Sequence, residues 1–419
     1  MRQNYKRLGD YIRLVDVRNK NLDVQTLLGV SIQKKLMPSI ANTVGTDMSN
    51  YKIIQRNQFA YGTVTSRNGD KISIALLKEF EKAIVSQIYL VFEIKDTAEL
   101  LPDYLMMWFR RPEFDRYARF KSHGSARETF DWNEMIETEL PIPSIEKQKE
   151  LVTEYQTIEN RIRLNNELCQ KLEETAQTVY RHWFEDFEFP VIARSEAQQN
   201  DEAISTNQIL QVAEPTAEYQ NRSELVAERN RSYKSSGGEM VYSEELGKEI
   251  PKGWKVGKLG DVITIGSGKS LNNFSKFKIN HHLNPVVGAG GINGYTDEFN
   301  FDEDIIVIGR VGTHGKVQRF HQKCWATDNT LVIIPKYYEY TYQFLQSVNY
   351  IELNRGGVQA LITQTDIKNL EILLPHQNLI VLFENRFGEI FKKFEILNKQ
   401  TQKLEELKSL LLGKMAVER

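Results

Sequence analysis

One short sequence occurs twice in this chain and constrains its architecture more than any other feature. Residues 170–174 read Gln-Lys-Leu-Glu-Glu, and residues 402–406 read the same, 232 positions later. Residues 8–10 read Leu-Gly-Asp and recur at 259–261, 251 positions later. Landmarks that keep their order along a chain indicate an internal duplication. Because the offset falls from 251 to 232, the second copy is 19 residues shorter internally.

Each copy ends in a long segment whose apolar residues have helical spacing. In residues 144–187 and 376–412 they recur at steps of three and four, which predicts amphipathic or coiled-coil helices. Prolines directly precede both segments, where a missing N–H does no harm. About 40 residues at 1.5 Å each make a helix of roughly 60 Å, which favours an antiparallel pair over ordinary bundle core. Contacts between Leu168–Leu172 and Leu404–Leu407 are expected to hold the pair together.

The rest of the chain predicts two mixed domains of the α+β class. Short apolar runs at 58–64, 88–92, 305–308 and 330–334 are typical of strands, and 99–118 and 341–352 of short helices. The regular helix–strand alternation of a doubly wound fold is missing. We therefore expect a pseudo-two-fold internal repeat, in which each mixed domain is followed by a long helix. The expected segments are a first domain at 1–143, a spacer helix at 144–187, an acidic flexible linker at 188–249 with helix near 208–231, a second domain at 250–375 and a second spacer helix at 376–419.

Charge is distributed unevenly along these segments. The whole chain carries −2, but residues 1–143 carry +3 and residues 250–375 carry +2, whereas residues 188–249 carry −6. A modestly basic domain is also ordinary for a globular protein. The two cysteines, Cys169 and Cys324, have no metal-ligand spacing and fit a reducing compartment. Without a signal peptide or a long apolar run, a cytoplasmic protein without membrane contact is expected.

Several motifs suggest chemistry that the surrounding sequence does not support. Residues 266–270 read Gly-Ser-Gly-Lys-Ser, like the end of a phosphate-binding loop, but Ile263 stands where that motif needs glycine. The histidines near Cys324 lack the spacing of a zinc site, so no metal is expected. Hydrolase, nuclease and methyltransferase motifs are also missing. These observations predict a binding subunit with no catalytic residues, and an ATPase using Gly266–Ser270 is the enzymatic alternative.

Three stretches carry a family resemblance that extends over nearly the whole chain. They are residues 238–261, which include Ile-Pro-Lys-Gly-Trp at 250–254, residues 359–375, and Leu-Glu-Glu-Leu-Lys-Ser-Leu-Leu at 404–411. Together they resemble the specificity subunits of type I restriction-modification enzymes. The long 188–249 linker departs from the family plan. The resemblance implies two target-recognition domains, two methyltransferase subunits that grip the helices, S-adenosylmethionine bound by those subunits, and a translocase/nuclease subunit in the larger assembly.

The expected function is sequence-specific binding of double-stranded DNA. Each domain would read one half of a bipartite site in the major groove, and the paired helices would set the gap. The target adenine would flip into the pocket of a partner subunit, which would carry out methylation or restriction. The alternative without DNA is a coiled-coil scaffold bearing two protein-binding modules.

Polar loops next to strands are the candidate contact sites, since Arg and Gln suit guanine and adenine edges. The equally simple interpretation of each residue is an ordinary solvated loop position. The candidate DNA contacts are Ser66, Arg67, Asn68, Lys71, Lys121, His123, Ser125, Arg127, Lys269, Arg310, His314, Lys316, Arg355 and Gln359. The candidate partner contacts, expected to point outward from the long helices, are Arg181, Phe184 and Lys408.

Overall fold

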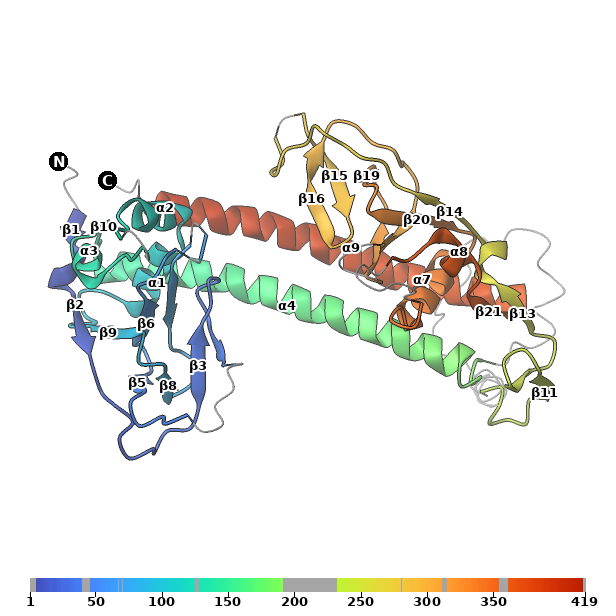
Figure 1. Ribbon diagram of the computed structural model, residues 1–419, viewed down its shortest axis with the longest axis horizontal. Coiled ribbons are helices and arrows are strands. Elements are labelled where there is room, and N and C mark those ends of the chain that lie inside the picture. The colour runs from blue at the N-terminus through green and yellow to red at the C-terminus, as the bar shows by residue number, and fades with distance from the viewer. Residues whose placement is uncertain are drawn as a thin grey trace, which may run out of the picture. The chain divides into compact units, whose positions relative to one another are not determined.

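The structure is a computed structural model that describes residues 5–39, 46–66, 68–69, 71–124, 128–190, 232–279, 281–310, 315–353 and 361–416. The chain divides into two compact units (Figure 1). Unit 1 contains Met1–Glu167 and Leu397–Arg419, and unit 2 contains Leu168–Ile396. Within the described ranges, none of the helices combines the length and apolar character needed to cross a bilayer.

Unit 1 contains two four-stranded sheets. The first is antiparallel and has the order β2-β9-β6-β7; the second has the order β4-β3-β8-β5, with β3 and β8 parallel. A separate pair joins β1 to β10. The strands are β1 Tyr5–Arg7, β2 Ile12–Val15, β3 Leu27–Val30, β4 Leu36–Pro38, β5 Lys52–Gln55, β6 Phe59–Gly62, β7 Ser73–Leu76, β8 Lys82–Val85, β9 Leu90–Ile94 and β10 Glu139–Pro141.

Three helices and one 3-10 turn complete the first mixed domain. They are η1 Leu8–Asp10, α1 Pro102–Arg110, α2 Pro112–Phe120 and α3 Trp132–Ile136. Pro112 explains why the single helix expected over 99–118 is two helices, because proline favours the first turn of a new helix and disfavours helical backbone before it. Asp131 caps α3 by accepting a hydrogen bond from the backbone N–H of Glu134 at 3.0 Å.

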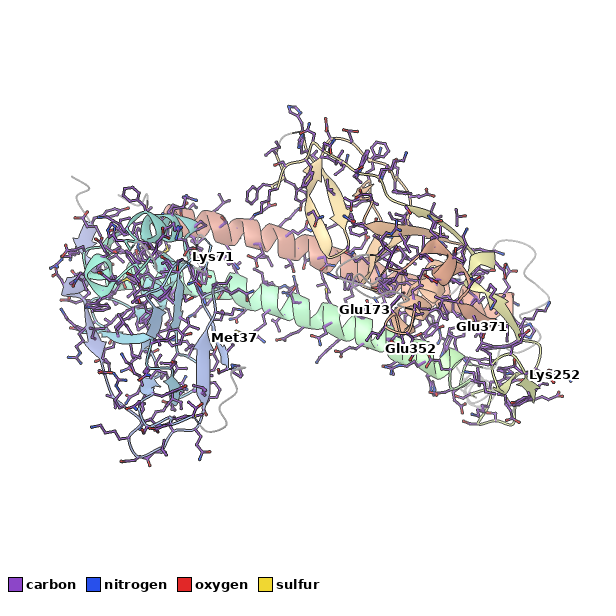
Figure 2. All side chains as sticks on the ribbon, in the orientation of Figure 1. Met37, Lys71, Glu173, Lys252, Glu352 and Glu371 are labelled. Carbon is purple, nitrogen blue, oxygen red and sulfur yellow. The ribbon has the colours of Figure 1, made fainter. Side chains whose placement is uncertain are left out.

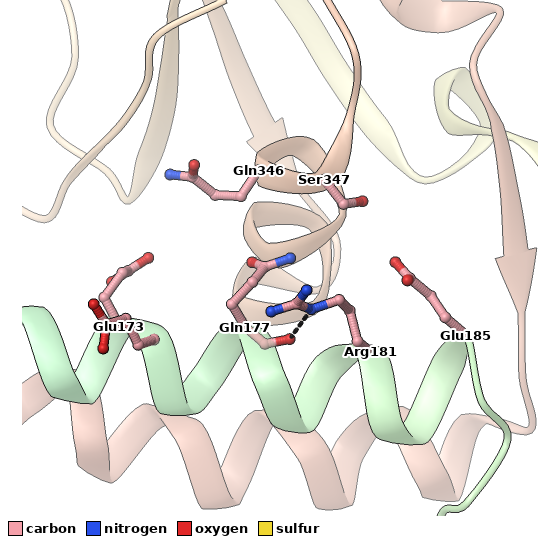
Figure 3. A pocket seen from close by; sticks show the side chains of 7 residues that line it. Glu173, Gln177, Arg181, Glu185, Gln346 and Ser347 are labelled. Carbon is pink, nitrogen blue, oxygen red and sulfur yellow. Dashed lines mark hydrogen bonds between the residues drawn. The ribbon is translucent and has the colours of Figure 1, made fainter.

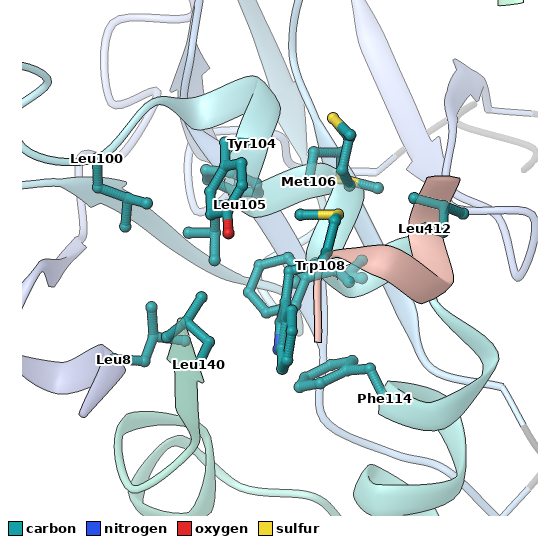
Figure 4. Close-up of a cluster of buried hydrophobic side chains, with 14 of the residues drawn as sticks. Leu8, Leu100, Tyr104, Leu105, Met106, Trp108, Phe114, Leu140 and Leu412 are labelled. Atoms are coloured by element: carbon teal, nitrogen blue, oxygen red, sulfur yellow. The ribbon is translucent and has the colours of Figure 1, made fainter. Parts of the chain in front are cut away.

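Strands β6, β7 and β9 of the first sheet of unit 1 are buried on both faces, and their alternating side chains separate two cores. Phe59 and Tyr61 lie in the core formed with α1 and α2, whereas Ala60 lies in the core shared with the second sheet. This division follows from the period of two in a strand. In the first core, Leu412 of the C-terminal helix faces the cluster that contains Trp108 (Figure 4).

Unit 2 repeats this plan with shorter connections. A four-stranded antiparallel sheet has the order β14-β20-β17-β18, and a three-stranded sheet has the order β16-β15-β19, with β15 and β19 parallel. Pairs β11-β12 and β13-β21 accompany them. The strands are β11 Met240–Ser243, β12 Lys248–Pro251, β13 Lys255–Lys258, β14 Ile263–Ser267, β15 Asn284–Gly288, β16 Gly291–Thr296, β17 Ile305–Gly309, β18 Val317–Phe320, β19 Trp325–Ala326, β20 Thr330–Pro335 and β21 Glu371–Leu374.

The described helical elements of unit 2 between β11 and α9 correspond to η1, α1 and α3 of unit 1. They are η3 Leu259–Asp261, α7 Tyr338–Ser347 and α8 Gln364–Lys368. The large sheet again separates two cores, since Ile306 and Ile308 belong to one and Ile305 and Val307 to the other. This explains why residues 305–309 form a continuous buried strand rather than an alternating one.

The order of elements confirms the internal duplication. The start of β17 lies 246 positions after that of β6, α7 starts 236 positions after α1, and α8 starts 232 positions after α3. The offset therefore falls stepwise from 251 to 232 through each copy. This places the missing residues of the second copy in the connections between matching elements.

Two long helices, α4 Ile145–Phe184 and α9 Gln377–Lys414, follow the two copies. In unit 1, Asn165 of α4 donates a hydrogen bond to Thr401 of α9 at 3.3 Å. In unit 2, Trp183 of α4 packs edge-on against Phe383 of α9, with ring centroids 5.7 Å apart. The start of one helix thus meets the end of the other within each unit, as an antiparallel pair requires (Figure 1).

The end of α9 belongs to the first domain. Leu411, Leu412 and Met415 are buried in the core of unit 1. The hydroxyl of Tyr5, in the first strand, donates a hydrogen bond to the backbone oxygen of Ala416 at 3.1 Å. The beginning and the end of the described chain therefore meet in unit 1, as expected from an antiparallel return.

The residues expected to hold the helix pair together were only partly right. Leu168 and Leu407 are 37% and 50% exposed, whereas Leu404 packs against the core of unit 1. The buried positions nearby are Asn165 and Cys169, at 2% and 7% exposed. Helical spacing alone does not determine which face of a helix is buried when apolar residues are scattered around it.

The flexible linker predicted at 188–249 was also partly wrong. Its ends are structured: Phe189 stacks on Tyr233 and Trp254, with ring centroids 4.6 and 5.2 Å apart, and β11 pairs with β12. Aromatic stacking supplies the buried apolar area that the polar composition of the segment did not predict. The helix expected near 208–231 lies outside the described residues.

Candidate nucleic-acid interface

Two polar loops of unit 1 that the sequence analysis selected lie together. The loop between β6 and β7 and the loop between α2 and α3 are joined by the hydroxyl of Thr65, which donates to the hydroxyl of Ser122 at 2.9 Å. The backbone N–H of Phe130 donates to the oxygen of Thr63 at 2.9 Å, and that of Thr65 to Glu128 at 2.9 Å. These bonds hold the loops side by side above the end of the large sheet.

The candidate DNA contacts in these loops differ in their exposure and in whether neighbouring groups already bind their side chains. Ser66 is exposed. Lys71 is exposed as well (Figure 2). The amide of Asn68 donates to the oxygen of Val64 at 3.0 Å, so it shapes the turn. Lys121 and His123 lie 3.5 and 3.6 Å from the carboxylate of Glu134. That carboxylate offsets part of the positive charge of Lys121.

In unit 2, the described ends of the equivalent loops are joined by a matching bond. The backbone N–H of Ile362, just before α8, donates to the oxygen of Arg310, just after β17, at 3.3 Å. This bond corresponds to the one between Phe130 and Thr63 in unit 1. The Nε atom of Arg310 is buried without a hydrogen-bond partner among the described residues. The described ends of the two loops are therefore neighbours in each domain.

The other two described candidates of unit 2 lie around its small sheet. The ammonium group of Lys316 donates to the backbone oxygen of Gly290, in the turn between β15 and β16, at 2.5 Å. The backbone of Lys269 is held by Ala326 and by the indole N–H of Trp325, at 2.9 and 2.8 Å, while its side chain is exposed.

The local structure also argues against the phosphate-binding loop at Gly266–Ser270. Residues 263–267 form β14, and the residues that follow, 268–279, form no helix. A phosphate-binding loop needs a helix N-terminus directly after it to direct backbone N–H groups at the anion. Gly268 has a packing reason instead, because a Cβ there would lie 2.2 Å from the backbone oxygen of Thr327.

Six candidate DNA contacts lie outside the described residues. They are Arg67, Ser125, Arg127, His314, Arg355 and Gln359. They stay predictions from the sequence.

The three candidate partner contacts on the long helices have different environments. Arg181 is exposed and lines a cleft of about 480 Å³ between α4 and the end of α7, together with Glu173, Glu185 and Gln346 (Figure 3). The side chain of Lys408 is 21% exposed and pairs with Glu405 at 2.6 Å.

Phe184 does not point outward, so that expectation was wrong. Its side chain is 1% exposed and contacts the rings of Tyr340 and Phe383, with centroids 4.7 and 5.1 Å away. The end of α4 turns this residue into the core of unit 2, where its area is best buried.

Buried charges near the long helices were missed by the sequence analysis. In unit 2, the guanidinium of Arg319 on β18 lies between the rings of Tyr342 and Phe391, 3.5 and 3.4 Å from their centroids, and pairs with Glu339 at 3.0 Å. Burial raises the pKa of Glu339 to about 8, and the charge of Arg319 opposes that rise. Glu173 of α4 lies 3.5 Å from the same guanidinium. Sequence patterns gave no signal for this cluster, because its members lie on four separate elements.

A second buried ion pair occurs in unit 1. The ammonium group of Lys34 lies 2.7 Å from Asp115, and their side chains are 5% and 12% exposed. Burial lowers the pKa of Lys34, and Asp115 opposes that shift. Asp115 also accepts a hydrogen bond from the backbone N–H of Ile72 at 3.2 Å. The pair has structural partners on every side, which favours a structural role. Across the described part of the chain, no three His, Cys, Asp or Glu side chains are grouped as a metal site would require.

Comparison with known proteins agrees with this architecture. Residues 251–409 match the family model described as the type I restriction modification DNA specificity domain. The chain is 24% identical over 404 residues to the type I restriction enzyme HindI specificity subunit of Haemophilus influenzae, covering 87% of this chain and 86% of that protein. It is 22% identical over 341 residues to the MjaIX specificity subunit of Methanocaldococcus jannaschii, covering 75% and 68%.

A solved structure has a similar fold. It is the crystal structure of a type I restriction-modification S subunit from M. genitalium, with a TM-score of 0.51 and 13% identity over 99% of this chain and 96% of that one. Together with the duplicated two-sheet domains, each followed by a long helix, these comparisons give one result. The chain is similar over most of its length to specificity subunits of type I restriction enzymes, and its second copy matches the DNA specificity domain of such systems.

Proposed function

We propose that this chain reads a bipartite DNA site, with each recognition domain contacting one half. The observation that carries the proposal is the recurrence of the same loop pair in both units, joined by Phe130 to Thr63 in one and by Ile362 to Arg310 in the other. Two similar polar surfaces on one chain suit two half-sites on one duplex. Phosphate contacts would position each domain, and base edges in the major groove would give specificity.

The chemistry would belong to partner subunits. Two methyltransferase subunits would bind the long helices, hold S-adenosylmethionine and receive the flipped adenine. A translocase/nuclease subunit would join the assembly for restriction. Arg181 and Lys408 are the proposed partner contacts that remain, because Phe184 is buried. The two free cysteines, Cys169 and Cys324, are buried, which fits action in the cytoplasm, where thiols stay reduced.

A domain exchange tests the two-reader proposal. Residues 1–143 are replaced by the first domain of another family member, and adenine methylation is mapped across the host genome by long-read sequencing. We expect one half of the methylated site to change and the other half to stay. A change in both halves would contradict the assignment of one half-site to each domain.

The spacer role of the helices needs a separate experiment. Two helical turns are deleted from both α4 and α9 at matching positions, and methylation is mapped again. The gap between half-sites should shorten, because the helix pair would set the distance between the readers. An unchanged gap would mean that another part of the assembly determines the spacing.

The alternative is a scaffold with two protein-binding modules. It predicts that deleting the gene leaves adenine methylation unchanged, and that the chain mixed with a methyltransferase shows no preference among DNA sequences. Loss of one methylated motif on deletion would exclude this alternative.

A further inference from the structure

A segment of unit 2 in which the sequence analysis selected only Lys269 is free of acidic residues. From residue 262 to residue 296 the chain has no Asp or Glu, although it has 56 of them in all. The same stretch contains Lys269, Lys276 and Lys278, followed by His281 and His282. Such a gap removes the like-charge repulsion that acidic side chains would exert on a polyanion.

The centre of this stretch is anchored to the small sheet. Ser275 exchanges two backbone hydrogen bonds with Tyr295 of β16, at 2.8 and 2.7 Å. Gly294 makes this contact possible, because a Cβ there would lie 2.4 Å from the oxygen of Ser275. The ammonium group of Lys278 lies 5.3 Å from the ring centroid of Tyr295. We call residues 271–279 the arm; it lies along β16 before the chain enters β15 (Figure 1).

The arm exposes apolar side chains that the domain core does not use. Phe277 is 72% exposed and Ile279 is 52% exposed, and Leu283 just beyond the arm is 60% exposed. The backbone N–H of Phe277 donates to the hydroxyl of Ser275 at 3.2 Å, which fixes the bend that directs this residue away from the sheet. Exposed aromatic and aliphatic groups beside lysines mark an interaction surface.

We propose that this arm is a DNA-contacting element of the second recognition domain. Lys276 and Lys278 bind phosphates, and Phe277 makes an apolar contact with base edges of the same duplex, as aromatic side chains do with thymine methyl groups. The inference rests on the proposed function, because it supposes that unit 2 binds DNA at all. It adds a surface distinct from the loop pair at Arg310 and Ile362.

Neighbouring groups favour DNA as the occupant. Lys316 donates to Gly290 in the β15–β16 turn, and Lys269 is held next to β19, so both candidate lysines of this domain lie around the same small sheet. The equivalent hairpin of unit 1, β3–β4, lies within residues 24–46, which also lack Asp and Glu. Two matching acid-free hairpins, one in each reader, suit a ligand that is anionic along its whole length.

The phosphate contacts are tested by the salt dependence of binding. The full chain, purified with its methyltransferase subunits, is titrated into a fluorescent 40-base-pair duplex of random sequence at several salt concentrations. The double variant Lys276→Gln/Lys278→Gln should make the negative slope of log K against log salt shallower by about 2. It should also weaken the affinity at 0.2 M salt roughly tenfold. The matched control is Lys252→Gln/Lys323→Gln, because these exposed lysines of the same unit already pair with Glu239 and Asp302, at 2.9 and 3.1 Å.

The apolar contact is tested with Phe277→Ala. The probes are a duplex carrying the genomic site found by methylation mapping and a scrambled duplex of equal length. The ratio of the two affinities should fall about fivefold or more, with the salt slope unchanged, because a base contact discriminates and a phosphate contact does not. Tyr242→Ala is the control, since Tyr242 is 67% exposed in the same unit and lies on β11, outside the arm.

The outcomes separate the two proposals. A wild-type complex that binds neither duplex contradicts the proposed function itself. Wild-type binding with an unchanged slope in the lysine variant, or an unchanged ratio in Phe277→Ala, overturns the arm and leaves the proposed function standing. The same holds if the variants instead lose their methyltransferase subunits on purification, since the arm would then contact protein. All four variants change exposed side chains, and equal unfolding temperatures would establish that they fold.

Discussion

The hydroxyl of Tyr104 donates a hydrogen bond to the backbone oxygen of Pro141 at 3.0 Å, and this contact fixes α1 against β10. Unit 2 contains the equivalent bond, from Tyr340 on α7 to the backbone oxygen of Leu373 on β21. Both tyrosines are 1% exposed. In each copy the bond joins the domain to the strand that leads directly into a long helix, so the duplication preserved a connection as well as a sequence.

We expect Tyr104→Phe and Tyr340→Phe to destabilise their own units by similar amounts. Each substitution keeps the ring and leaves a buried carbonyl oxygen without its donor, which costs about 1 kcal/mol. Urea unfolding combined with hydrogen exchange would assign each loss to one unit. A loss in the other unit, or a difference of several-fold between the two variants, would contradict the equivalence of the bonds.

Removing Arg319 should destabilise unit 2 more than removing its whole ion pair. In Arg319→Met, the buried carboxyl group of Glu339 loses its hydrogen-bond donor, which costs about 1 to 3 kcal/mol. The double variant Arg319→Met/Glu339→Met should lose less, because neither buried polar group is left without a partner. A double-mutant cycle on the free energy of unfolding measures the coupling, and additive losses would show that the pair is not coupled.

Because the pKa of Glu339 is raised, the free energy of unfolding of unit 2 should depend on pH. With a folded pKa of about 8, the native state holds a proton that the unfolded chain releases near its ordinary value. This stabilising contribution is full below the unfolded pKa and is lost as pH rises through the folded pKa. The free energy of unfolding of Glu339→Gln should therefore fall less than that of wild type between about pH 6 and about pH 9. Parallel curves for the two proteins would mean that Arg319 keeps Glu339 ionised throughout.

The ion pair of unit 1 gives a matched case away from the long helices. Asp115→Ala leaves the ammonium group of Lys34 buried without its carboxylate and removes the acceptor of the Ile72 N–H. We expect a loss of about 3 to 5 kcal/mol in unit 1 and none in unit 2. Lys34→Met/Asp115→Asn should recover part of this loss, since an amide can still accept from Ile72. Failure of the double variant to recover any stability would show that the charges are not the source of the cost.

Substitutions at Phe184 and Arg181 should have different effects, the first on the stability of unit 2 and the second on partner binding. Phe184→Ala opens a cavity among Tyr340, Phe383 and Trp254 and should cost about 3 to 5 kcal/mol. Arg181→Ala changes an exposed side chain and should leave stability within about 0.5 kcal/mol. Thermal unfolding measures both effects, and co-purification with the methyltransferase subunit tests Arg181 as a contact. A stable Phe184→Ala protein would contradict the packing described for the end of α4.

The net charge of the whole segment 250–375 gave no sign of the basic arm of unit 2. The acid-free stretch ends at residue 296, and Asp297, Glu298, Asp302, Glu303 and Asp304 follow at once. Averaging over 250–375 combined these opposite runs into +2. A shorter window would have separated them, so this signal was present in the sequence and was lost by the choice of segment.

The sequence by itself determined the duplication, the α+β class and the long helices, expected at 144–187 and 376–412 and observed at Ile145–Phe184 and Gln377–Lys414. Repeats and helical periodicity are local properties, so they can be read without knowing what the chain contacts. Only the tertiary structure decided that Phe184 is core, that Leu168 is exposed, and that Arg319 is buried between two rings. Those outcomes depend on partners from distant elements, and a side chain's burial and pKa follow from those partners rather than from its neighbours in sequence.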